Sequence, residues 1–230
     1  MLFRQLFDRS SCTYTYLLAC DRTAQAVLID PVVACVERDE RLLSELELSL
    51  RWVLETHVHA DHVTGSATLR DRLGGESVVA ANAGVVGASR AVRTGDRVVF
   101  GDRYLEARET PGHTAGCVSY VLDDHSAVFT GDALFVRGCG RTDFQAGSSV
   151  TLYRSVHTQL FTLPDATKVY PGHDYNGQTV STIGEERAHN PRLGGGRDED
   201  AFVAIMNALD LSPPAHIDVA LPANLKGGVS

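Results

Sequence analysis

Short apolar stretches separated by Gly, Asp and Asn fill most of the first 135 residues, a pattern typical of β-strands joined by turns. Polar and apolar residues alternate in TYTYLLAC (13–20), and QAVLIDP (25–31) follows after a DRTA turn, so this pair predicts a hairpin. The same pattern predicts further strands at 51–56, 77–81, 97–100, 104–110, 117–123, 126–132 and 168–172.

Helical spacing is clearest in ERDERLLSELELSL (37–50), where four leucines fall on one face and charged residues occupy the rest. Other helices are predicted at 62–74, where Gly74 provides the end, and at 149–163, 180–190 and 198–209, whereas 213–224 is expected to be irregular. There is no obvious internal repeat and no long low-complexity linker. We therefore expect residues 1–230 to form one domain that mixes helices and strands.

Composition and charge narrow the class of protein. A hydrophobic fraction of 43% and a charged fraction of 22% are ordinary for a soluble globular chain. The net charge of −8 argues against a nucleic-acid or membrane-surface partner, and no apolar run reaches the roughly 18 residues of a membrane helix. Five cysteines without a Cys-x-x-Cys pair suit a reducing compartment, and the N-terminus lacks the features of a secretory signal, so we expect a cytoplasmic protein.

Metal-binding side chains are concentrated in ETHVHADHVTGS (55–66) and recur in three later loops. Each later loop follows a predicted strand, in ETPGHTAGC, FTGDALF and VYPGHDY. Strands that enter one sheet in the same sense would bring these loops to one edge. Imidazole and carboxylate groups at this density suit zinc, iron or manganese. The predicted site comprises His57, His59, Asp61, His62, His113, Asp132 and His173.

Each of these positions also has a simpler explanation. A single His113 or His173 is more often a surface histidine, and a single Asp132 is more often a turn residue or a helix cap. The four loops taken together nevertheless favour a metal site. His125, His157, His189 and His216 have no such context and are interpreted as structural or surface residues. Cys139 lies between two glycines, which favours tight packing over a role as nucleophile or sulfur carrier.

The motifs THVHADH, GHTAG, GDALF and YPGHDY resemble the four metal motifs of the metallo-β-lactamase superfamily. This resemblance implies an αββα four-layer sandwich with a metal site at one edge between the two sheets. Three longer stretches, 129–148, 170–193 and 217–228, resemble the persulfide dioxygenases of the ethylmalonic-encephalopathy-protein type.

Membership of that family implies conversion of glutathione persulfide, O₂ and water to glutathione and sulfite, a reaction of sulfide detoxification. Oxygen chemistry requires a metal that shares electrons with O₂, which zinc does not do. The implied cofactor is one Fe(II) per chain, with His57, His113 and Asp132 as catalytic ligands. The remaining positions would orient ligands and water by hydrogen bonds, although in dinuclear hydrolases they help to hold a second metal: His59, Asp61, His62 and His173.

The same resemblance provides candidate glutathione-binding residues, namely Arg141, Tyr175, Arg192, Asn224 and Lys226. Arg141 is open to two interpretations, a substrate contact or a structural ion pair, and for Arg192 the structural role is favoured. Lys226 stands where the family has arginine, and lysine loses the bidentate geometry that arginine offers to a carboxylate.

Two other functions remain in competition. One is a glyoxalase II-like dinuclear hydrolase of glutathione thioesters, in which Asp61 and a bridging Asp132 would hold a hydroxide nucleophile. The other is a non-catalytic module that binds metal or carries sulfur. Metal content discriminates between the dioxygenase and the hydrolase, because the dioxygenase needs one iron and the hydrolase needs two metals. The oligomeric state is left open, a homodimer included, and a sulfurtransferase that makes or uses persulfide is a chemically sensible partner.

Overall fold

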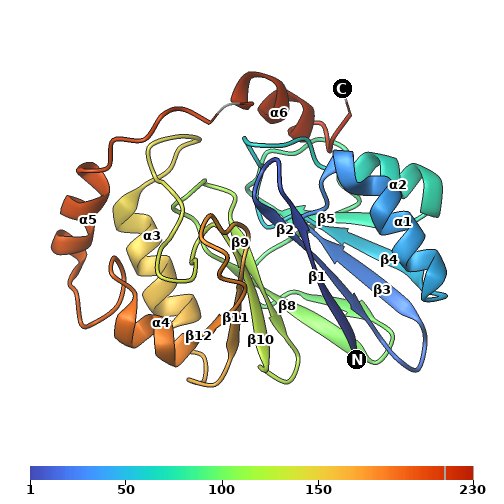
Figure 1. Cartoon of the computed structure of the whole chain (residues 1–230), viewed down its shortest axis with the longest axis horizontal. Helices are drawn as coiled ribbons and strands as arrows, with labels where there is room; N and C mark the ends of the chain where they lie inside the picture. The colour runs from blue at the N-terminus through green and yellow to red at the C-terminus, as the bar shows by residue number, and fades with distance from the viewer. Residues whose placement is uncertain (215, 230) are drawn as a thin grey trace.

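The computed structural model describes residues 1–214 and 216–229, and this part of the chain forms two six-stranded sheets that pack face to face (Figure 1). The first sheet runs in chain order, as β1 (Leu2–Asp8), β2 (Thr13–Ala19), β3 (Gln25–Ile29), β4 (Ser49–Leu54), β5 (Glu76–Ala80) and β6 (Arg90–Val92). The second sheet runs in reverse chain order, as β12 (Ser181–Thr182), β11 (Lys168–Pro171), β10 (Ala127–Gly131), β9 (Val118–Leu122), β8 (Arg103–Glu109) and β7 (Arg97–Phe100).

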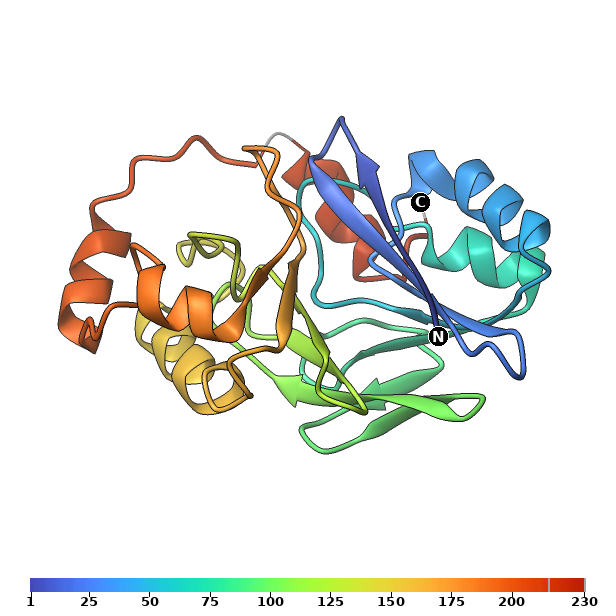
Figure 2. The same cartoon turned by 60° about the horizontal axis from the view of Figure 1, so that its bottom comes forward.

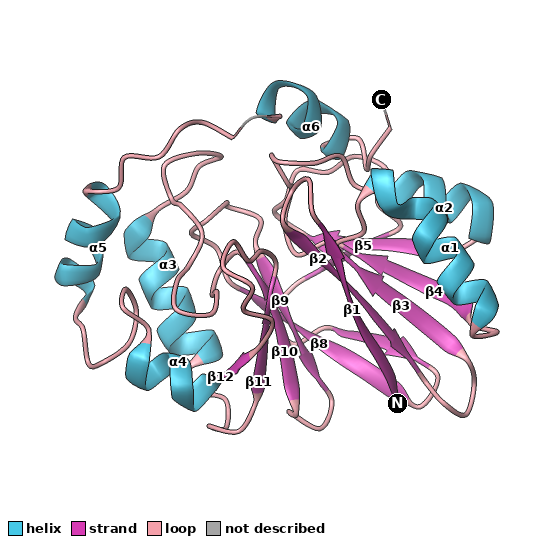
Figure 3. Cartoon of the chain, viewed as in Figure 1, coloured by secondary structure: helices cyan, strands magenta, loops and turns pink. Residues whose placement is uncertain are grey.

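Helices cover the outer faces of both sheets, as Figure 3 shows. The first sheet carries α1 (Val36–Glu45) and α2 (Ser66–Leu73). The second carries α3 (Ser149–Ser155), which continues as a π-helical turn (Val156–Leu160), together with α4 (Ile183–His189) and α5 (Glu199–Asn207). The turned view of Figure 2 places these two helical layers on opposite sides of the strands. The predicted αββα sandwich is confirmed.

Three apolar clusters hold the four layers together, and β2 belongs to two of them. Tyr16 and Leu18 point into the core between the sheets, where the ring of Tyr16 lies 5.0 Å from that of Phe129. Leu17 and Ala19, on the opposite face of β2, pack against the side that carries α1 and α2. Burial of each large apolar side chain contributes roughly 1.5–3 kcal/mol, so a central strand buried on both faces anchors the fold.

The sequence prediction was wrong in places that reflect tertiary packing. The helix expected over 37–50 ends at Glu45, and Glu47 adopts a positive φ of 53°, which frees Ser49 to begin β4. The segment 213–224 was expected to be irregular but contains α6 (Ile217–Asn224), with Pro222 inside the helix. The edge strands β1 and β6 and the two-residue β12 were not predicted.

Candidate metal centre

The predicted metal-binding side chains meet where strands of both sheets end. His57 follows β4 of the first sheet, whereas His113, Asp132 and His173 follow β8, β10 and β11 of the second. The three later loops therefore leave one sheet, and the histidine string reaches them from the other. β10 and β11 are parallel, and β8 points the same way because both β8 and β10 are antiparallel to β9. Three of the four loops consequently emerge at one end of the second sheet.

The side chains separate into two neighbouring groups. His57, His113 and Asp132 each offer a ligand atom within 4.8 Å of the others, and we call them the first group. The second group, whose ligand atoms obey the same limit, consists of His59, Asp61, His62 and His173. The groups touch through His173, whose Nδ1 donates to Asp132 Oδ1 at 2.7 Å. The geometry brings all seven residues together, while their roles as ligands stay a prediction.

His57 is prepared to offer a lone pair. Its Nδ1 lies 3.0 Å from Thr56 Oγ1, and that hydroxyl donates its proton to Asp30 Oδ2 at 2.7 Å. Thr56 must therefore accept from the Nδ1–H of His57, which leaves Nε2 without a proton. Burial, assisted by the nearby His59, holds the pKa of His57 well below its ordinary value. A neutral imidazole is the form that binds a metal.

His113 has a similar arrangement. Its Nδ1–H donates to the backbone carbonyl of Arg141 at 2.7 Å, so its Nε2 is the free nitrogen and lies 3.5 Å from Asp132 Oδ2. Although burial acts to raise the pKa of Asp132, the charges of His173 and His113 outweigh it and hold that pKa below the usual range. The first group thus presents one ring nitrogen from each of two histidines and one carboxylate, a donor set that fits a divalent transition metal.

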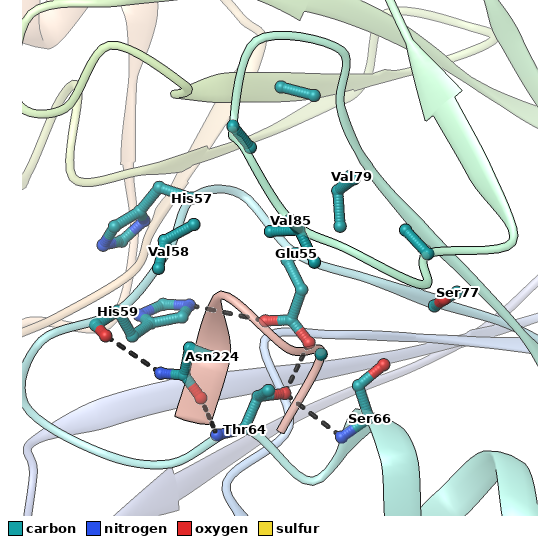
Figure 4. A pocket seen from close by; sticks show the side chains of 14 residues that line it. Glu55, His57, Val58, His59, Thr64, Ser66, Ser77, Val79, Val85 and Asn224 are labelled. Atoms are coloured by element: carbon teal, nitrogen blue, oxygen red, sulfur yellow. Dashed lines mark hydrogen bonds and ion pairs between the residues drawn. The ribbon is translucent and has the colours of Figure 1, made fainter. Parts of the chain in front are cut away.

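Two carboxylates, those of Asp30 and Glu55, lie close to the ring of His59. Its Nε2 lies 3.1 Å from Asp30 Oδ1 and 3.6 Å from Glu55 Oε2, and Figure 4 shows Glu55 facing His59. Burial acts to lower the pKa of His59, but the charge of Asp30 dominates and raises it. The buried Asp30 also adopts a positive φ of 50°, which is uncommon for a residue other than glycine.

The backbone geometry requires glycine at two positions that immediately precede candidate ligands. Gly112 has a φ of +139°, and a Cβ there would lie 2.3 Å from the backbone of Leu152. Gly131 has a φ of +50°, and a Cβ there would lie 2.5 Å from Thr56 Oγ1. A side chain at either position would be strained and would displace the loop that carries His113 or Asp132.

A cavity of about 560 Å³ opens over the first group, and Tyr175, Arg141 and Arg192 line it. Tyr175 is largely exposed, and its ring stacks on that of His173. The guanidinium of Arg141 makes a bidentate pair with Asp143 at 2.7 Å and also donates to the carbonyls of Leu211 and Ser212. These bonds favour the structural interpretation of Arg141. Arg192 donates to the carbonyl of Cys139.

Asn224 and Lys226, predicted to bind substrate, do not line this cavity. The buried amide of Asn224 accepts from the backbone N–H of Thr64 at 2.9 Å and donates to the carbonyl of His59 at 2.9 Å (Figure 4). It also donates to the carbonyl of His62 at 2.8 Å. Its polar atoms are thereby used to hold the histidine loop. Lys226 is exposed and lies beyond the end of α6.

The two cysteines near the site are buried. Burial raises the pKa of Cys139 to about 11 and that of Cys117 to about 12, so both remain thiols at neutral pH. Cys139 Sγ lies 3.8 Å from the sulfur of Met206, in the core between the second sheet and its helices. This placement agrees with a packing role.

Four residues with contacts at the site escaped the sequence interpretation: Thr13, Asp30, Glu55 and Thr56. The last two immediately precede the histidine string, and Asp30 directly follows β3, so their positions carried a signal. Thr13 begins a strand whose alternating pattern predicts only structure, and no local pattern distinguishes Thr13 from its neighbours.

Comparison with known proteins agrees with the fold. The model of the metallo-beta-lactamase superfamily matches residues 13–173, so the chain belongs to that superfamily. Bovine mitochondrial persulfide dioxygenase ETHE1 is 52% identical over 230 residues, covering 100% of this chain and 89% of that protein. The crystal structure of ETHE1 from Myxococcus xanthus, also 52% identical, superimposes with a TM-score of 0.96 and covers 99% of this chain and 100% of that one. Within the superfamily, the chain is a persulfide dioxygenase of the ETHE1 type.

A more distant relative represents the competing chemistry. The hydroxyacylglutathione hydrolase of Brucella anthropi is 35% identical over 222 residues, covering 93% of this chain and 80% of that protein.

Among the residues that the structure describes, no helix is long and apolar enough to cross a membrane.

Proposed function

We propose that the chain oxidises glutathione persulfide with O₂ and water to sulfite and glutathione, at a single Fe(II) held by His57, His113 and Asp132. The outer sulfur of the persulfide loses the electrons that O₂ gains, and water supplies the third oxygen of sulfite. The supporting observation is the donor set of the first group, in which the second nitrogen of each histidine is already engaged. Iron in such a site supplies electrons to O₂, which zinc does not do.

The protein's own residues would orient this centre. His173 donates from Nδ1 to Asp132 Oδ1 and from Nε2 to Asp61 Oδ2 at 3.0 Å, so it fixes which oxygen of Asp132 is free to face the first group. Burial opposes the charge on His173, but the two carboxylates dominate and raise its pKa well above the ordinary value. A protonated His173 would hold both carboxylates in place and would stay out of the iron's coordination sphere.

Glutathione would occupy the large cavity. It carries two carboxylates, which suit the guanidinium of Arg192, and the exposed ring of Tyr175, stacked on His173, lines the same cavity. We assign Arg141 to shaping the wall, since its guanidinium already binds Asp143 and two carbonyls. Asn224 and Lys226 receive no part in substrate binding.

Oxygen uptake tests this proposal. Anaerobically purified, Fe(II)-loaded protein is given fresh glutathione persulfide, and O₂ and sulfite are measured together. We expect uptake with sulfite formation, and loss of both in His113→Ala and Asp132→Ala. The exposed His189 provides a matched control, because His189→Ala removes an imidazole that lies outside both groups. Iron-replete protein that consumes no oxygen would refute the proposal.

A hydrolase is the alternative that the second group supports, because its four residues provide a potential second metal site. The same preparations are therefore offered a glutathione thioester after loading with zinc. Hydrolysis by protein that holds two metals per chain, without oxygen uptake in the iron form, would favour the hydrolase. Metal binding without turnover of either substrate would favour a non-catalytic module.

A further inference from the structure

The hydroxyl of Thr13, at the first residue of β2, lies among the side chains of the second group. Thr13 Oγ1 is 3.2 Å from Asp61 Oδ2, 3.3 Å from His62 Nδ1 and 3.1 Å from His173 Nε2. The residue is fully buried. One oxygen atom therefore contacts three of the four side chains that would bind a second metal.

The backbone fixes this hydroxyl in place. Thr13 forms an antiparallel β-bridge with His173, the N–H of Tyr14 donates to the carbonyl of Gly172 at 2.8 Å, and the N–H of Asp174 donates to the carbonyl of Cys12 at 3.2 Å. These bonds join the start of β2 to the loop after β11. Thr13 and His173 consequently cannot move apart without breaking paired backbone hydrogen bonds.

Hydrogen bonding and metal binding compete for the same atoms. A ring nitrogen has one in-plane position, so a nitrogen that holds a hydrogen bond is not free to bind a metal. His173 uses Nδ1 for Asp132 and Nε2 for Asp61 and Thr13, so both of its nitrogens are engaged. A metal would need to approach each ligand atom to about 2.0–2.2 Å, inside the contacts that the hydroxyl now makes.

We propose that Thr13 determines the metal stoichiometry of the chain, because its hydroxyl engages Asp61 Oδ2 and His173 Nε2, two of the ligand atoms that a second metal in this group would need. The inference rests on the proposed single iron at the first group and deepens it. It explains how a chain that carries all the side chains of a dinuclear centre holds one metal. Thr13 is a specificity-determining residue in this account and contacts neither substrate nor iron.

Metal counting tests the inference directly. Wild type, Thr13→Ala and Thr13→Ser are loaded anaerobically with Fe(II), and separately with Zn(II), then desalted and analysed for metal per chain. We expect about one metal in wild type and in Thr13→Ser, which keeps the hydroxyl. In Thr13→Ala we expect a count near two with zinc, and a second-site dissociation constant lower by about tenfold or more, because the hydroxyl that competes for Asp61 and His173 is removed.

Thr15 provides the matched control. It lies two residues along the same strand, is equally buried, and donates to the backbone carbonyl of Asp30 at 2.9 Å. Thr15→Ala should keep one metal, which separates a specific effect from general loosening of β2. If Thr13→Ala fails to fold, Thr13→Val carries the test, since valine keeps the β-branched shape and removes only the hydroxyl.

The outcomes separate the two proposals. Two metals per chain in wild-type protein would overturn the single-iron proposal and remove the basis of this one. One metal in wild type and also in folded Thr13→Ala and Thr13→Val would overturn the role of Thr13 and leave the single iron intact. A second metal in Thr15→Ala as well would also overturn the role of Thr13.

Discussion

Replacing Asn224 by alanine should loosen the histidine loop and leave substrate recognition intact. The Asn224 amide makes three hydrogen bonds, to the N–H of Thr64 and to the carbonyls of His59 and His62, and all of these groups are buried. Each lost bond costs about 1 kcal/mol, or more where the remaining partner stays unsatisfied. We expect the free energy of unfolding to fall by about 3 kcal/mol.

Urea unfolding of the metal-free protein provides the measurement, with the exposed Asn207→Ala as control. Asn207 lies on α5, away from the loop, so its replacement should change stability by less than about 0.5 kcal/mol. Iron affinity should also fall in Asn224→Ala, because His57 lies immediately before the loop that is released. Unchanged stability together with a raised KM for glutathione persulfide would refute the structural role and restore the substrate contact expected from sequence.

Three further predictions follow from the packing around the site. Gly112→Ala forces a side chain onto a φ of +139° and against the backbone of α3, so it should lower stability by about 2 kcal/mol or more and reduce bound iron, as measured by urea unfolding and metal analysis. Native Cys117 and Cys139 should resist iodoacetamide at neutral pH and react after unfolding; labelling of the folded protein would contradict their burial. The raised pKa of Cys139 also means that its contribution to stability is complete below the ordinary value of 9.0 and is lost as pH rises toward 11, so Cys139→Ala should lose less stability than wild type between those pH values.

The sequence predicted the layers of the fold well because buried strands such as β2 and β10 carry their own apolar pattern. It failed where a tertiary contact decides the local structure. Proline is unfavourable inside a helix by about 3 kcal/mol, yet α6 includes Pro222 because Ala220, Ala223 and Asn224 are buried against the rest of the chain. β1 escaped prediction because its residues are only partly buried, so its pattern is weak.

For the site, residue types and their order along the chain were enough to find the seven clustered side chains. Their division into two groups depends on ring orientation, which sequence does not encode. Thr56 and Asp30 orient His57, the carbonyl of Arg141 orients His113, and such contacts appear only in three dimensions. The substrate-binding residues stay a prediction, and sequence did not indicate that Asn224 bonds to the backbone of the histidine loop.

Contacts between the two sheets set the spacing of the first group. The N–H of Val118 on β9 donates to the carbonyl of Thr56 at 2.8 Å, and the hydroxyl of Tyr120 donates to the carbonyl of Glu55 at 3.1 Å. These bonds join the segment just before His57, from the first sheet, to a strand of the second sheet that neighbours those preceding His113 and Asp132. The distance from His57 to its partners is therefore fixed by backbone carbonyls before any metal binds. A metal site split between two sheets can be this well ordered because the loop that supplies His57 is hydrogen-bonded to the sheet that supplies the other two ligands.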